Sequence, residues 1–236
     1  MSLTYMENME KKVDLMDIHN LLTNAEKGDA NAQFSLGTCY SYGNGVEKDL
    51  RKAEYWWIKA ASQCDGEFSY QYRLGYYYFY GFVLSKNYVQ AVYWWEKSAI
   101  NGNILALKGL ATCYSNGYGV EIDMARAFDL YKKLATTGDK EYAYMVGMCY
   151  YEGKGVQQDL KVAVSWFFKS ASHQRGITRG NKDAQYMLGY CYFNGIGVDK
   201  NFHDAIKWYK KAAKNGNPKA KNEIESLIYR FIPNRR

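Results

Sequence analysis

One short pattern recurs five times along this 236-residue chain, and such a chain folds by stacking copies of one small unit. The copies are LGTCYSYGNGV at 36–46, LGYYYFYGFVL at 74–84, LATCYSNGYGV at 110–120, VGMCYYEGKGV at 146–156 and LGYCYFNGIGV at 188–198. A small marker residue stands at Gly37, Gly75, Ala111, Gly147 and Gly189, so successive copies are 38, 36, 36 and 42 residues apart. No single catalytic site needs such periodicity, whereas a stack of two-helix units does.

Each copy has the residues of a helix, a turn and a second helix. Apolar residues such as Ala32, Leu36 and Cys39 have the spacing of a buried helical stripe. The glycines of the GxG triplet suit the end of that helix. Side chains suited to start the second helix follow at Asp49, Asn87, Asp123, Asp159 and Asn201. Glycine inside a helix lowers helix stability by about 1 kcal/mol relative to alanine. Gly37 therefore predicts that the second helix of the repeat approaches closely at this position.

The pattern resembles the Sel1-like repeat family, relatives of tetratricopeptide repeats with the motif AxxxLGxxYxxGxGVxxDxxKAxxWYxKAAxxG. Repeats one and five match almost throughout. Repeat three has Ala111 and Leu130 where glycine and tryptophan are usual, and repeat two has Gly81-Phe82-Val83 in place of the GxG pair. We therefore expect the turn of repeat two to differ. The resemblance implies an all-α fold, a right-handed α/α superhelical solenoid of about five repeats with half-repeat helical caps.

This organisation predicts three parts of the chain. An N-terminal segment with a capping helix occupies 1–28, the repeats occupy 29–216, and a C-terminal capping helix with a basic tail occupies 217–236. The expected repeat boundaries are 29–66, 67–102, 103–138, 139–180 and 181–216.

The sequence offers little for chemistry. The GxG triplets lack a third glycine and a preceding strand, and no Ser/His/Asp order or HExxH motif occurs. The five cysteines form no CxxC pair, and the odd count argues against a closed disulfide set. We expect no catalytic residue, no metal site, no cofactor and no small-molecule substrate. Free thiols without a signal peptide or a membrane span predict a cytoplasmic protein.

Members of the resembled family generally act as adaptors or scaffolds, which implies another protein as partner, bound as a peptide or a helical segment. In the related tetratricopeptide geometry, the concave face is built from first-helix positions three before the marker and one, four and five after it. Transferred here, the partner-binding candidates are Phe34, Tyr42, Tyr72, Tyr76, Phe79, Tyr80, Lys108, Asn116, Tyr144, Tyr151, Glu152, Tyr186, Tyr190 and Phe193. Exposed aromatic rings with polar tips are typical of protein interfaces. Aromatic residues at the Phe34 and Tyr186 position could equally pack within their own repeat.

Two alternatives remain open. The first is a stoichiometric regulator or immunity-type neutraliser of an enzyme or toxin, for which the convex face or loop 173–180 would matter. That loop offers His173, Arg175 and Arg179 as secondary contacts. The second is an electrostatic nucleic-acid binder, because residues 157–236 hold 15 Lys and Arg against 6 Asp and Glu. We rank it below the others, since lysines on the solvated face of a helix are ordinary.

Overall fold

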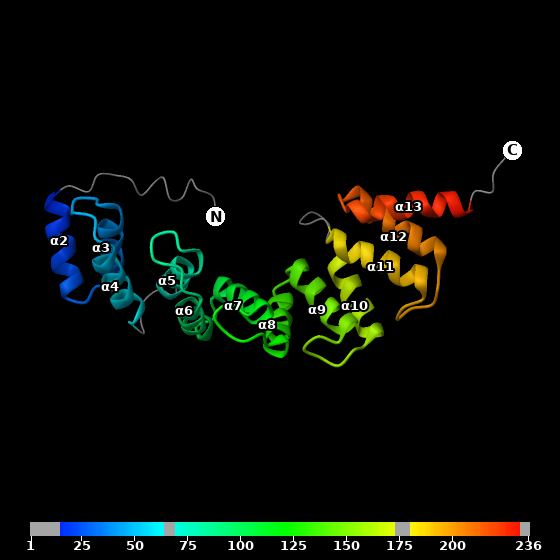
Figure 1. The fold of residues 1–236 in the computed structure, drawn as a ribbon, viewed down its shortest axis with the longest axis horizontal. Helices are drawn as coiled ribbons and strands as arrows, with labels where there is room; N and C mark the ends of the chain where they lie inside the picture. Colours follow the sequence, from blue (N-terminus) through cyan, green and yellow to red (C-terminus); the bar gives the residue numbers. More distant parts are fainter. Residues whose placement is uncertain (1–14, 64–68, 173–179, 232–236) are drawn as a thin grey trace. The chain divides into compact units, whose positions relative to one another are not determined.

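The fold is all-α. The structure, a computed structural model, describes residues 15–63, 69–172 and 180–231, and no strand occurs in these ranges (Figure 1). The helices are α2 (Leu15–Glu26), α3 (Ala30–Tyr42), α4 (Leu50–Ala61), α5 (Ser69–Tyr80), α6 (Tyr88–Ile100), α7 (Ile104–Asn116), α8 (Met124–Thr136), α9 (Lys140–Glu152), α10 (Leu160–Ala171), α11 (Lys182–Asn194), α12 (Phe202–Lys214) and α13 (Pro218–Phe231). None of the described helices is long and apolar enough to cross a membrane.

The chain forms two compact units, Met1–Glu121 and Ile122–Arg236. The first contains α2 to α7 and the second contains α8 to α13, and the division falls in the turn of the third repeat. Within each unit every helix packs against the next helix along the chain. The prediction of successively stacked helical hairpins is therefore confirmed inside each unit.

The marker glycines let the two helices of a repeat approach closely, as predicted. A Cβ atom built on Gly37 would lie 2.7 Å from Cδ1 of Trp57 and 2.9 Å from the carbonyl oxygen of Ala53. The same relation joins Gly75 to Trp95, Gly147 to Phe167, and Gly189 to Tyr209. The aromatic ring of the second helix thus occupies the space that a side chain on the first helix would need.

The predicted caps are present. Asp49 accepts hydrogen bonds from the backbone amides of Arg51 and Lys52 at the start of α4. The corresponding residues cap their helices in the same way at Asn87, Asp123, Asp159 and Asn201. The first glycine of the triplet ends the first helix in the left-handed conformation at Gly43, Gly117, Gly153 and Gly195.

Repeat two departs at the second glycine of the triplet, as its sequence predicts. Gly45, Gly119, Gly155 and Gly197 all have positive φ at this position. Val83 replaces this glycine in repeat two, and no described non-glycine residue has positive φ. The turn after α5 therefore takes another path, in which Leu84 is buried and Phe82 is exposed.

A single helix covers one end of each unit, α2 in the first and α13 in the second. On α2, Ala25 is buried, and Leu21 and Leu22 pack against the core around Leu36. On α13, Ala220 and Leu227 are buried against Tyr209 and its neighbours in α12. These helices shield apolar faces that a repeat stack would otherwise expose.

Candidate functional site

Eight aromatic rings form one continuous cluster in the first unit. Four of them stand on α5 at positions i, i+4, i+7 and i+8, which share one helix face. The members are Tyr72, Tyr76, Phe79 and Tyr80 of α5, Phe82 of the following turn, Tyr88 and Trp95 of α6, and Tyr118 after α7. We call this set the aromatic cluster.

Phe79 holds the centre of the cluster. Its ring centroid lies 5.0 Å from those of Tyr80, Tyr88 and Trp95, and 5.7 Å from that of Tyr118. These separations and tilted orientations are those of favourable aromatic pairs. Phe79 thereby links α5 to α6 and to the turn of the next repeat.

The outer edge of the cluster faces solvent. The ring centroid of Tyr80 lies 4.5 Å from that of Tyr76 and 5.5 Å from that of Phe82. Tyr80 is 49% exposed, Phe82 63% and Tyr118 37%. Large apolar rings exposed together on a folded surface commonly mark a contact site.

Two hydroxyl groups of the cluster, those of Tyr72 and Tyr76, have raised pKa values. Burial raises the pKa of Tyr76 above its ordinary value, and the neighbouring Tyr80 hydroxyl raises it further. Burial likewise raises the pKa of Tyr72, with further contributions from Tyr76 and Tyr80. None of the hydrogen bonds within the described residues uses these three hydroxyls. The cluster therefore offers apolar ring surface together with hydroxyl groups that can form hydrogen bonds.

The turn of repeat two explains why the cluster opens to solvent there. In repeat three the second glycine, Gly119, packs so tightly that a Cβ would lie 2.4 Å from the backbone of Tyr88. In repeat two Val83 stands at this position and Phe82 lies on the surface, stacked with Tyr76 and Tyr80. Phe82 thus adds an exposed ring at a triplet position that holds Asn44, Lys154 and Ile196 in repeats one, four and five, and Tyr118 in repeat three.

The structure corrects one predicted contact residue. Phe34 is buried, with its ring stacked 4.6 Å from Tyr70 and 6.0 Å from Trp57. It joins the cores of repeats one and two, so its ring is not available to a partner. Tyr42, about two turns after it on the same helix, is 50% exposed.

In the second unit the predicted aromatic residues mainly support the core. Tyr144 and Tyr151 pack against the cluster of buried residues around Phe167. Tyr186, Tyr190 and Phe193 pack against the buried residues around Tyr209. All five rings are half-buried.

The predicted polar candidates are engaged locally. Lys108 is half-buried and Asn116 donates a hydrogen bond to the carbonyl oxygen of Thr112 at 2.9 Å. Glu152 forms an ion pair with Lys154 at 2.7 Å. The loop candidates His173, Arg175 and Arg179 lie outside the described residues.

Sequence reasoning missed four members of the cluster. Phe82 and Tyr118 stand in turns, and Tyr88 and Trp95 stand on a second helix, whereas the prediction considered first-helix positions alone. The available signal was the aromatic residue inside the degenerate triplet, since a turn normally carries small or polar residues.

Successive helical hairpins, each packed on the next, define the class of α-helical repeat proteins. The Sel1 repeat model matches five segments covering most of the chain, at residues 30–63, 69–103, 104–139, 140–174 and 182–217. The chain belongs to the Sel1 repeat family. Sel1-repeat proteins generally mediate protein–protein interactions.

Two solved structures share this architecture. A Sel1 repeat protein from Oxalobacter formigenes is 33% identical, with a TM-score of 0.59 over 89% of this chain and 59% of its own. The protective antigen c5321 of uropathogenic Escherichia coli, which displays an SLR fold, is 31% identical, with a TM-score of 0.57 over 93% of this chain and 53% of its own.

Two curated relatives are similar over shorter stretches. Chitin synthase regulatory factor 2 of Schizosaccharomyces pombe is 40% identical over 70 residues, 29% of this chain. DAP3-binding cell death enhancer 1 of Rattus norvegicus is 28% identical over 148 residues, 63% of this chain. The chain spans 14% and 29% of the length of these relatives.

Proposed function

We propose that this chain is a non-enzymatic scaffold that binds a peptide or helical segment of another protein on the aromatic cluster of its first unit. The observation that carries the proposal is the continuous set of rings whose outer members, Tyr80 and Phe82, are about half exposed or more. Tyrosine and other aromatic residues are enriched in protein interfaces because they combine a large apolar surface with a polar tip.

Rigid presentation is the mechanism we propose. Phe79 and Trp95 fix the inner side of the cluster against α6, so the outer rings are held before a partner arrives. A preorganised surface loses less conformational entropy on binding, which leaves more of the contact free energy as affinity.

The relatives are consistent with this role. One is named as a regulatory factor of chitin synthase and the other as DAP3-binding. We place the scaffold in a reducing compartment, because Cys39, Cys113, Cys149 and Cys191 are buried free thiols.

A displayed-peptide selection tests the proposal. Peptides are selected from a random library against the full chain, and their dissociation constants are measured for the wild type and for Tyr80→Ala combined with Phe82→Ala. We expect the double variant to lose about tenfold or more in affinity, since central aromatic residues dominate interface energetics. Both side chains are exposed, so the thermal unfolding midpoint should stay close to that of the wild type.

Tyr55→Ala combined with Tyr93→Ala provides the matched control. These tyrosines are 52% and 46% exposed, but they stand on α4 and α6 outside the aromatic cluster. The control should bind the selected peptides as the wild type does. Selected peptides that bind the Tyr80/Phe82 variant with unchanged affinity would contradict the proposal.

A further inference from the structure

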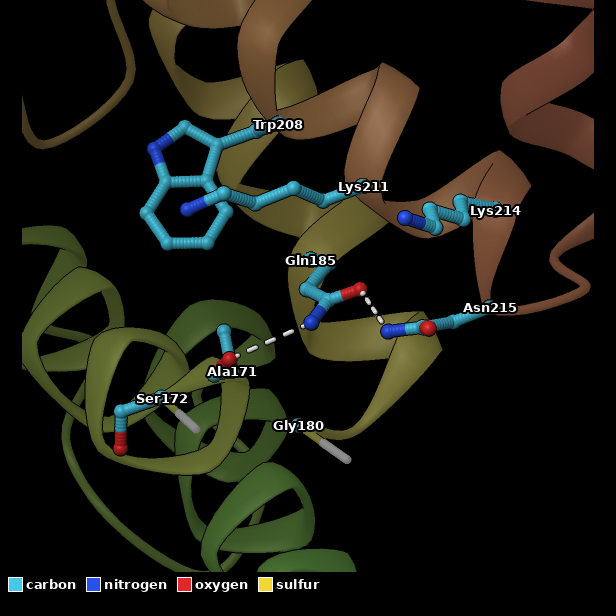
Figure 2. A pocket seen from close by; sticks show the side chains of 8 residues that line it. All are labelled: Ala171, Ser172, Gly180, Gln185, Trp208, Lys211, Lys214 and Asn215. Carbon is cyan, nitrogen blue, oxygen red and sulfur yellow. Dashed lines mark hydrogen bonds between the residues drawn. The ribbon is translucent and has the colours of Figure 1, made fainter. Parts of the chain in front are cut away.

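The second unit contains a cavity of about 450 Å³ between the ends of three helices (Figure 2). The end of α10, the start and first turn of α11, and the last two turns of α12 contribute its walls. The lining residues are Ala171, Ser172, Gly180, Gln185, Trp208, Lys211, Lys214 and Asn215. We call this cavity the basic pocket.

A buried amide network fixes the floor of the basic pocket. Gln185 is 4% exposed, and its Nε2 donates a hydrogen bond of 3.2 Å to the carbonyl oxygen of Ala171. Asn215 Nδ2 donates to Gln185 Oε1 at 2.9 Å (Figure 2). A Cβ atom on Gly180 would lie 2.0 Å from the same carbonyl oxygen of Ala171. The backbone at Gly180 therefore approaches the end of α10 more closely than a residue with a side chain could. The polar groups of the floor are thus satisfied by one another.

The charge in the pocket is positive. Lys211 Nζ lies 4.0 Å from the ring centroid of Trp208, and Figure 2 shows its side chain extended across the indole. Lys214 lines the same cavity one turn further along α12. No carboxylate is among the lining residues, and neither lysine belongs to an ion pair within the described residues.

The second lysine distinguishes this repeat from the others. A lysine three residues after a tryptophan lies over the indole ring also in Trp56–Lys59, Trp94–Lys97 and Trp166–Lys169. This pair is therefore part of the repeat pattern. The position of Lys214 is instead occupied by Ser62, Ile100, Thr136 and Ser172 in the other four repeats. A second lysine three residues after the tryptophan–lysine pair therefore occurs in repeat five alone.

We infer that the basic pocket binds an anionic side chain of a partner peptide, either a carboxylate or a phosphorylated residue. An ammonium group can donate charge-assisted hydrogen bonds to an oxyanion, and the pocket offers two such groups. A volume of about 450 Å³ is within the range of pockets that enclose a small group.

A peptide fits these observations better than a nucleic acid. Non-specific nucleic-acid binding needs several cations that follow the phosphate backbone, whereas two lysines line this pocket. A base would also need an open aromatic face. The Trp208 ring already has Lys211 over one face and Phe168 in T-shaped contact at 5.5 Å.

Fluorescence anisotropy with the full chain tests this inference. The probes are three fluorescein-labelled peptides of one length and frame, bearing consecutive glutamates, a phosphoserine, or glutamines in the same places. We expect the glutamate or the phosphoserine peptide to bind, the glutamine peptide not to bind, and the affinity to fall with added salt. The tighter of the two anionic peptides identifies the preferred anion.

Charge-matched variants decide whether the pocket is responsible. The double variant Lys211→Gln with Lys214→Gln should lower the affinity for the anionic peptide by about tenfold or more. Lys59→Gln with Lys207→Gln removes the same charge, one lysine from the equivalent tryptophan pair of repeat one and one from the exposed side of α12. This control should bind like the wild type.

The remaining outcomes are also decisive. Absence of binding by both anionic peptides, or equal losses in the two lysine variants, would overturn the inference. A single-stranded oligonucleotide that binds more tightly and depends on the same two lysines would show a nucleic-acid site instead. The Tyr80/Phe82 variant should bind the anionic peptide normally, so this inference and the proposed function fail separately.

Discussion

At the scale of single residues, one close contact in four of the five repeats joins a marker glycine to an aromatic ring. Trp57 is 1% exposed, and its Nε1 donates a hydrogen bond to the carbonyl oxygen of Phe34 at 3.1 Å. The indole is therefore pinned to α3 next to Gly37. A helix-breaking residue persists in the middle of α3 because it makes room for this ring.

Gly37→Ala should destabilise the protein although alanine is the better helix former. The helix gains about 1 kcal/mol in intrinsic propensity, but the new Cβ meets a hydrogen-bonded ring and a backbone oxygen, neither of which can move freely. Overpacking of this kind typically costs about 1–3 kcal/mol, so we expect a net loss in the free energy of unfolding measured by urea denaturation.

Ser35→Ala in the same helix is the control, because Ser35 is exposed and alanine there gains only propensity. The control should be neutral or slightly stabilising. A Gly37→Ala protein as stable as the Ser35→Ala protein would contradict the close-approach argument.

At the scale of helices, a glutamine clamp joins consecutive repeats. Gln33 Nε2 donates to the carbonyl oxygen of Ala25 at the end of α2, and Gln63 Nε2 donates to Gln33 Oε1 at 2.7 Å. The same first bond joins Gln71 to Ala61 and Gln185 to Ala171. Repeats three and four have Leu107 and Ala143 at this position, so the clamp exists at three of the five junctions.

Gln33→Leu should loosen α2. Leucine fits this position in repeat three, but here it would remove the bond from Gln33 to the carbonyl oxygen of Ala25, which keeps its bond from the Gly28 amide, and the bond from Gln63 to Gln33. Each lost hydrogen bond costs about 0.5–1.5 kcal/mol. We expect a lower free energy of unfolding and faster hydrogen exchange for the backbone amides of α2.

Gln157→Leu controls for the change of residue type, because Gln157 is exposed in the loop before α10. Its exchange rates in α2 should equal those of the wild type. Unchanged exchange in Gln33→Leu would show that hydrophobic contacts alone hold α2 in place.

The sequence predicted the helical elements well, because their signals are local. Asp49 caps the helix that its position indicates, and Gly43 takes the left-handed conformation that a helix end requires. The burial of the Phe34 ring was not predictable from such local signals. Its burial depends on Tyr70 of the next repeat, so one repeat read alone cannot show whether the ring faces a partner or a neighbour. The basic pocket was missed for the same reason, since three helices from two repeats build it.

At the scale of the whole molecule, the cores depend on tyrosine and cysteine as much as on purely apolar side chains. The chain has 24 tyrosines against 10 phenylalanines. Burial raises the pKa of the Cys113 and Cys191 thiols to about 12 and that of Cys149 to about 11. It also raises the pKa of Tyr77, Tyr142 and Tyr144 to about 12, and that of Tyr209 above its ordinary value. Both units therefore contain groups that must stay protonated to remain buried.

These shifts predict a loss of stability in alkaline solution. The unfolded chain releases protons from thiols near pH 9.0 and from phenols near pH 10.0, whereas the folded chain retains them to about pH 11 or 12. The stabilisation is complete below the unfolded pKa values and is lost as pH rises toward the folded ones. The free energy of unfolding should therefore fall steadily above about pH 9, and tyrosinate absorbance should appear together with unfolding for the buried phenols.

Tyr209→Phe isolates one of these groups. Tyr209 is 1% exposed, and desolvation is the largest cause of its raised pKa, ahead of the nearby Glu223 carboxylate. Removing its hydroxyl removes one proton that the folded state retains, so the variant should lose stability less steeply with rising pH than the wild type. Tyr93→Phe, at a 46% exposed position, should leave the slope unchanged. Equal slopes of the free energy of unfolding against pH in Tyr209→Phe and the wild type would show that this buried phenol has no part in the alkaline transition. The transition would then have to arise from the thiols and the other tyrosines.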